Sequence, residues 1–140
     1  MSKVPGRLYA AGSVLFVLCG FAHMLGQFGP STPDPGSEAL ERSMRTLVIP
    51  GTTFTYWRIM QCWGALFGGM TVALGVMLLA VVRASGDVRV RRTAARVGVA
   101  AAVLQTACVL IYATPPPAFF MVPAAILLLL AAVWREKAAT

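Results

Sequence analysis

Residues 56–82 have the sequence YWRIMQCWGALFGGMTVALGVMLLAVV, an apolar run in which Arg58 is the single charged residue. A helix of this length rises about 40 Å, more than the roughly 30 Å of a bilayer's hydrocarbon core. Three further apolar runs occupy about residues 8–28, 97–112 and 118–134. The sequence therefore predicts an all-α, polytopic membrane protein, with four transmembrane helices forming a single bundle domain over residues 1–140.

The composition of the whole chain also favours lipid as its solvent. Hydrophobic residues make up 58% of the 140 residues and charged residues 12%, whereas soluble domains average about 25% charged residues. A soluble fold of this size could not hide so much apolar surface. The net charge of +7 does not indicate nucleic acid as a partner, because the charges lie in short segments between apolar runs, where they set membrane topology.

Lysine and arginine are distributed unevenly between the two sides that four spans would define. The two tails and the connection between the second and third spans hold nine: Lys3, Arg7, Arg83, Arg89, Arg91, Arg92, Arg96, Arg135 and Lys137. The other side holds three: Arg42, Arg45 and Arg58. Because the basic side faces the cytoplasm, we expect a bacterial inner-membrane protein with both termini cytoplasmic. The first run should be a retained helix, since no signal-peptide cleavage site follows it.

The long connection at residues 31–55 contains a predicted amphipathic helix. Leu40, Met44 and Leu47 share one helical face at i, i+4 and i+7. Two charge pairs have the favourable i, i+4 order: Glu38 with Arg42 and Glu41 with Arg45. This short extracytoplasmic helix is expected to lie on the outer surface or to cap the bundle.

Polar side chains inside the predicted spans are the candidate functional residues, because polar groups are costly to bury in lipid. Each of three helices carries one stripe of them: Cys19, His23 and Gln27; Arg58, Gln61 and Cys62; Gln105, Cys108 and Tyr112. With the expected topology, all nine lie in the outer half of the membrane. We expect a shared pocket with the ligand-binding residues His23, Gln27, Arg58, Gln61, Gln105 and Tyr112. The alternative is that these groups only bond across helices and stabilise the bundle.

A metal or redox site is a second hypothesis. Its ligands would be Cys19, His23, Cys62 and Cys108, a donor set suited to Cu(I) or Zn²⁺. No metal-binding motif with short spacing accompanies these residues, and cysteines in apolar runs are commonly reduced, buried side chains. We therefore expect no cofactor, and an accessory metal-binding or redox subunit stays the alternative.

Catalysis is disfavoured by the placement of the acidic residues. None of the five carboxylates lies within a predicted span, which removes paired-carboxylate chemistry inside the membrane and weakens a proton-coupled transporter. We expect a non-enzymatic protein that binds a lipid, an apolar small molecule or a membrane-protein partner. A small dimeric transporter or channel is the further alternative.

Glycines indicate how two of the helices pack. Gly64 and Gly68 form a GxxxG pattern with Gly75 nearby, and Gly20 and Gly26 offer matching positions in the first span. Small residues allow helix backbones to approach closely. The second span is therefore expected to pack on the first, with homodimerisation through the same glycines as the alternative.

The chain resembles known proteins in two stretches: residues 20–28, GFAHMLGQF, and the later triplet Tyr56, Trp57 and Arg58. Over about residues 8–80 the chain resembles an uncharacterised family of small bacterial four-helix integral membrane proteins. The resemblance implies the same architecture and points to His23 and Gly26 as residues to test, while it implies no activity. The chain departs from the family pattern at Arg58, where an acidic residue is expected.

Overall fold

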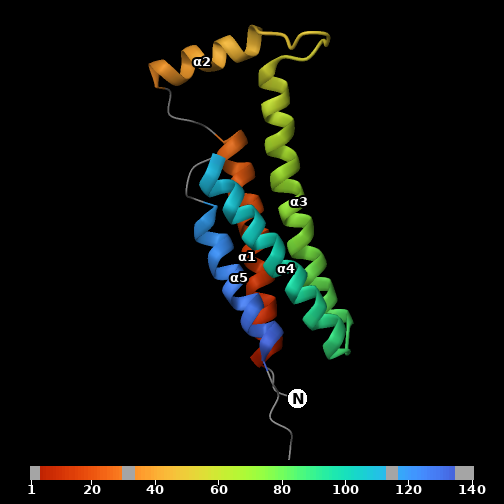
Figure 1. Cartoon of the computed structure of the whole chain (residues 1–140). Helices are drawn as coiled ribbons and strands as arrows, with labels where there is room; N and C mark the ends of the chain where they lie inside the picture. Colours follow the sequence, from red (N-terminus) through yellow and green to blue (C-terminus); the bar gives the residue numbers. More distant parts are fainter. Residues whose placement is uncertain (1–3, 30–33, 113–116, 135–140) are drawn as a thin grey trace, which may run out of the picture.

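A computed structural model describes residues 4–29, 34–112 and 117–134, and within these ranges it contains helices and no strand. The helices are α1 (Val4–Phe28), α2 (Pro35–Thr46), α3 (Tyr56–Ala84), α4 (Val88–Tyr112) and α5 (Ala118–Val133) (Figure 1). By length and composition, α1, α3 and α4 can each cross a membrane, whereas α5 is a shorter apolar helix. The expected all-α class is confirmed for the described residues, and the four-span topology stays a prediction.

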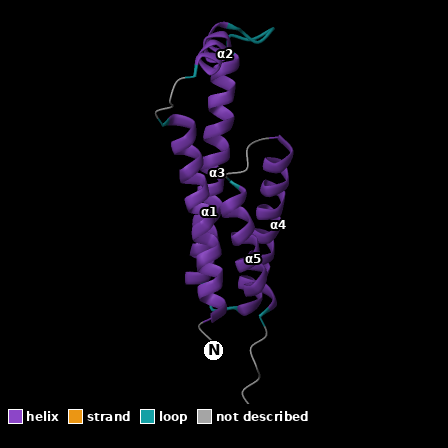
Figure 2. Cartoon of the chain, turned by 90° about the vertical axis from the view of Figure 1, so that its left-hand side faces the viewer, coloured by secondary structure: helices purple, strands orange, loops and turns teal. Residues whose placement is uncertain are grey.

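Four of the helices run side by side, and α2 lies across one end of them (Figures 1 and 2). α1 packs along both α3 and α5, and α5 also packs along α4, whereas α3 contacts α4 over a much smaller area. We call the end that α2 crosses the α2 end. The opposite end holds the start of α1, the connection from Ala84 to Val88 and the end of α5, and we call it the basic end.

Small and apolar side chains fill the centre of this arrangement. Phe16, Met121 and Leu128 are fully buried where α1 meets α5, together with Ala102 of α4. Large apolar side chains point outward instead, with exposed fractions of 72% for Leu25 and 76% for Phe119. An apolar exterior of this kind is unfavourable in water and typical of helices surrounded by lipid.

Glycines line the contact between α1 and α3. A Cβ atom on Gly20 would lie 2.6 Å from the carbonyl oxygen of Gly68, and one on Gly75 would lie 2.9 Å from that of Ser13. Gly26 differs from the expectation for helix packing, because a Cβ there would meet no described atom within 4 Å. Its part of α1 faces a groove and not a neighbouring backbone.

The helix expected from about residue 97 begins at Val88. Asp87 caps it, because its Oδ1 accepts a hydrogen bond from the backbone N–H of Arg89 at 2.7 Å. The arginines assigned to a connection are therefore largely helical, since exposed charged side chains do not interrupt a helix whose first N–H groups are capped. Arg92 donates to the carbonyl oxygen of Trp134 at 2.9 Å, which joins the start of α4 to the end of α5.

α2 begins with a capping box between Asp34 and Ser37. Of the two expected charge pairs, Glu41 and Arg45 form an ion pair at 2.7 Å; in the described part of the chain, Glu38 and Arg42 do not. The guanidinium of Arg45 also lies over the ring of Trp57, 4.3 Å from its centroid. These contacts hold α2 against the first turn of α3.

Candidate functional site

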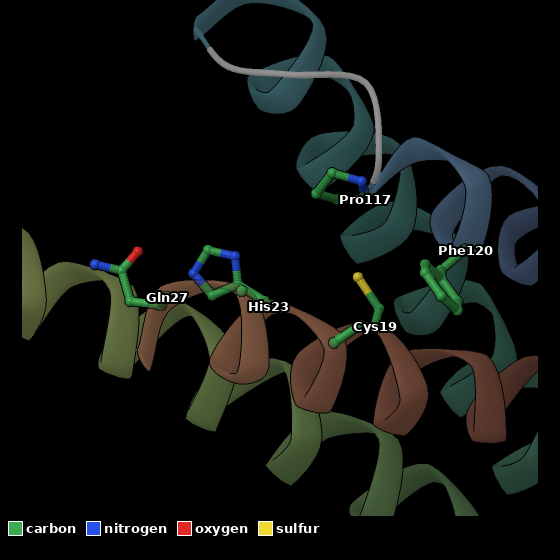
Figure 3. Close-up of a pocket in the computed structure, with 7 residues that line it drawn as sticks. Cys19, His23, Gln27, Pro117 and Phe120 are labelled. Atoms are coloured by element: carbon green, nitrogen blue, oxygen red, sulfur yellow. The ribbon is translucent and has the colours of Figure 1, made fainter. Parts of the chain in front are cut away.

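A groove of about 300 Å³ opens between α1 and the start of α5. Its lining residues are Cys19, Ala22, His23, Gly26, Gln27, Pro117 and Phe120. Figure 3 shows Cys19, His23 and Gln27 along one face of α1, with Pro117 and Phe120 opposite them. We call this space the His23 groove. It exists because α5 starts partway along α1, so the last turns of α1 pack on α3 but have no part of α5 beside them.

His23 is held in the groove by a ring contact with α3. The imidazole meets the ring of Phe67 edge to face, with centroids 4.8 Å apart and an angle of 64° between the planes. Its Nε2 atom is shielded from solvent and has no hydrogen-bond partner among the described residues. An unpaired buried nitrogen is costly, and because Nε2 is shielded, the imidazole would have to turn toward the groove for a bound molecule to reach it.

Gln27 lies one turn farther along α1 and crosses toward α3. Its Cδ atom occupies space 2.7 Å from where a Cβ of Gly64 would lie. The missing side chain at Gly64 therefore makes room for Gln27. The GxxxG pattern of α3 serves two purposes here, since Gly68 admits the backbone of α1 and Gly64 admits this polar side chain.

A larger groove, of about 770 Å³, lies beneath α2, and we call it the α2 groove. It is lined by Gly26, Gln27, Phe28, Gly29, Ser37, Leu40, Glu41, Met44, Arg45, Trp57, Arg58, Met60 and Gln61. Arg58 and Gln61, both expected to bind ligand, come from the first turns of α3. The residues expected to form one pocket are therefore divided between two grooves, and Gln27 lines both.

Gln105 lines neither groove. Its Nε2 donates to Oγ1 of Thr71 on α3 at 3.1 Å, and that hydroxyl donates to the carbonyl oxygen of Phe67 at 2.7 Å. Gln105 was grouped with the expected pocket by its depth along the helix, but its side chain bonds to α3 and does not line a groove with His23. Tyr112 is the last residue of α4, and its side chain lies outside the described part of the chain.

The four expected metal ligands are not brought together. Cys19 and His23 line the same groove, whereas the side chains of Cys62 and Cys108 are exposed on α3 and α4. In the described ranges, no three His, Cys, Asp or Glu side chains converge as a metal site would require. Equal depth in the membrane was the reason for grouping them, but it does not fix the direction in which each side chain points.

Several residues that shape the site carried no signal in the sequence. Phe67 and Phe120 are ordinary apolar residues within long apolar runs, so nothing marks them as contacts of His23 or of the groove. Thr71 was equally inconspicuous, because threonine in a helix commonly bonds to its own preceding turn. Nothing in the sequence marks Trp57 as a partner of Arg45, yet the guanidinium lies over its ring.

No family model, no curated protein and no solved structure matches this chain. The resemblance to small four-helix membrane proteins therefore stays a prediction, and the proposals below depend on the geometry of the two grooves.

Proposed function

We propose that this chain is a non-enzymatic inner-membrane protein that holds a lipid-like apolar molecule in the His23 groove. In this proposal it spans the membrane four times, with both termini in the cytoplasm. The basic end, which carries Arg7, Arg83 and Arg92, faces the cytoplasm, and α2 lies at the outer surface. The lysine and arginine distribution, nine residues against three, supports this orientation.

α5 is the fourth span in this proposal. Its 16 residues carry no charge, and they rise about 24 Å, several ångströms less than a typical hydrocarbon core. A bilayer adapts to such a mismatch by local thinning at a modest cost in free energy. Packing against α1 and α4 supports the same role, because it surrounds α5 with two helices that are long enough to span.

The observation that carries the ligand proposal is a mainly apolar groove, in which the polar side chains of His23 and Gln27 stand beside the apolar Pro117 and Phe120. Apolar walls with one or two placed polar groups are typical of sites for small apolar molecules. In this proposal a chain-like molecule enters the groove from the surrounding lipid. Among the described residues that line the groove, no carboxylate stands beside His23 to orient it as a general base.

The groove is tested by filling it. Ala22 is exposed in the groove, and Ala22→Phe should occupy the space of a bound chain without disturbing the core. Native mass spectrometry of the full chain, released from a nonionic detergent, should show one molecule of hexadecanol or hexadecyl phosphate bound to the unmodified protein. Ala22→Phe should abolish both adducts, while Ala73→Phe, at an exposed position outside both grooves, should leave them unchanged. Equal binding by the two variants, or no binding at all, would refute the proposal.

The topology is tested with two tags, one in the connection at residues 113–116 and one after residue 140. The expected result is that the first tag reaches the periplasm and the second reaches the cytoplasm. If both tags reach the same compartment, α5 does not span and the proposed orientation is wrong.

A further inference from the structure

The His23 groove and the α2 groove meet at Gly26 and Gln27, which line both of them. A Cβ atom on Gly26 would find open space within 4 Å. The helix surface that the two grooves share is therefore not crowded by any described neighbour at residue 26. One elongated molecule could occupy both grooves, with Gly26 beside its middle.

The charges differ between the two grooves. Among the described residues, the lining of the His23 groove includes no Asp, Glu, Lys or Arg, whereas the α2 groove includes Glu41, Arg45 and Arg58. Two of these offset each other, because Nε and Nη2 of Arg45 both donate to Oε1 of Glu41, at 2.8 and 2.7 Å. The guanidinium of Arg58 has no hydrogen-bond or ionic partner within the described ranges. One uncompensated positive charge therefore lines the α2 groove.

We propose that the ligand is an anionic amphiphile with a single acyl chain. Its chain lies in the His23 groove, and its phosphate or carboxylate headgroup lies in the α2 groove against Arg58. This inference rests on the proposed function, and it adds the sign of the headgroup and the residue that recognises it. A guanidinium suits this task because its planar fork donates two parallel hydrogen bonds to either kind of anion.

The division of the two grooves by polarity supports this orientation of the ligand. Phe120, Pro117 and Ala22 provide an apolar wall for a chain, and they offer nothing to stabilise a charge. An anion placed there would lose its hydration with only His23 and Gln27 as hydrogen-bond partners and no arginine or lysine among the lining residues that the structure describes. At the α2 end, Arg58 and Gln61 provide hydrogen-bond donors on the first turns of α3.

The first experiment compares three probes that share one chain: hexadecyl phosphate, palmitate and hexadecanol. Binding to the full chain in nonionic detergent is measured by native mass spectrometry. We expect one or both anions to bind about tenfold or more tightly than the neutral alcohol, as for one charge-assisted contact. The stronger of the two anions then distinguishes a phosphate from a carboxylate headgroup.

Arg58→Gln should remove that preference by weakening the binding of the anions to about that of hexadecanol, whereas Arg58→Lys should retain part of the preference. Arg42→Gln is the matched control, because it removes a positive charge from α2 at a position that lines neither groove. If hexadecanol binds as tightly as the anions and Arg58→Gln has no effect, the headgroup inference is overturned. Continued sensitivity to Ala22→Phe would then show that the proposed function itself still holds.

The junction has its own matched pair of variants. Gly26→Val and Gly69→Val both place a side chain in open space on a spanning helix, so both should unfold at the temperature of the unmodified protein. Gly26→Val should weaken binding of the anionic probes about tenfold or more, because it blocks the passage between the grooves. Gly69→Val should not. Equal affinity in the two variants would show that no ligand crosses the junction.

Discussion

The two halves of α1 pack in opposite ways. Between Gly12 and Gly20 the helix presents five buried residues to α3 and α5: Gly12, Ser13, Phe16, Cys19 and Gly20. Between Phe21 and Phe28 it has no buried residue, and its polar side chains line the two grooves. The change occurs where α5 begins beside it. Because α5 starts only partway along α1, the face of α1 that is buried up to Gly20 lines a groove beyond it.

Glycine shows the same contrast at the level of single residues. Gly20 lies where two backbones approach, and Gly26 lies six residues later over an open junction. The sequence context of both is apolar and helical, so the pattern alone predicts packing for each. The surroundings decide the role, because absence of a side chain allows close approach in one place and leaves a passage in the other.

The largest expected effect comes from Gly20→Val. Its Cβ would lie 2.6 Å from the carbonyl oxygen of Gly68 and 2.8 Å from the backbone nitrogen of Val72. Backbone atoms cannot rotate away, so α1 and α3 must separate, and we expect a loss of roughly 3 kcal/mol of stability. Thermal unfolding in detergent, followed by circular dichroism, compares the stability of Gly20→Val with that of Gly26→Val. The Gly26→Val variant should unfold at the temperature of the unmodified protein. Similar unfolding temperatures for the two variants would contradict the contrast between the two halves of α1.

A smaller effect is expected at the sparse contact between α3 and α4. The hydrogen bond from Gln105 to Thr71 joins these helices, and the Oε1 atom of Gln105 has no partner among the described residues. Thr71→Val should cost about 1 kcal/mol, because it leaves the amide of Gln105 unpaired. Adding Gln105→Leu should restore most of that loss, since it removes the unpaired group. A double-mutant cycle on unfolding free energies tests this, and strictly additive losses would argue against a coupled bond.

The ends of the helices could largely be predicted from the sequence. Tyr56 and Ala118 begin helices where the apolar runs were expected to begin, and Phe28 ends one beside Gly29. These positions are marked by local composition, which a single sequence carries in full. The start of α4 was placed late because hydropathy marks where lipid begins, whereas capping by Asp87 marks where the helix begins.

The division of the polar residues could not be predicted in the same way. Spacing along one helix shows that His23 and Gln27 share a face, and the structure places both in the His23 groove. The spacing does not show how one helix is rotated against its neighbours. Gln105 therefore bonds to α3 and Cys62 is exposed, although both were expected at the depth of a shared pocket.

The smallest expected effect concerns the attachment of α2 over its groove. Glu41 pairs with Arg45, and the same arginine stacks on Trp57. Exposed i, i+4 pairs contribute about 0.3–0.5 kcal/mol, so Glu41→Gln should increase transient opening of α2 about twofold. Amide hydrogen exchange over residues 35–46 measures that opening. Glu38→Gln is the matched control, because it removes the same charge from α2 at a position without an ion pair among the described residues. Faster exchange in the Glu41 variant alone would show that the pair holds α2 over the groove. Equal rates in both variants would show that net charge, and not this contact, governs how firmly α2 is held.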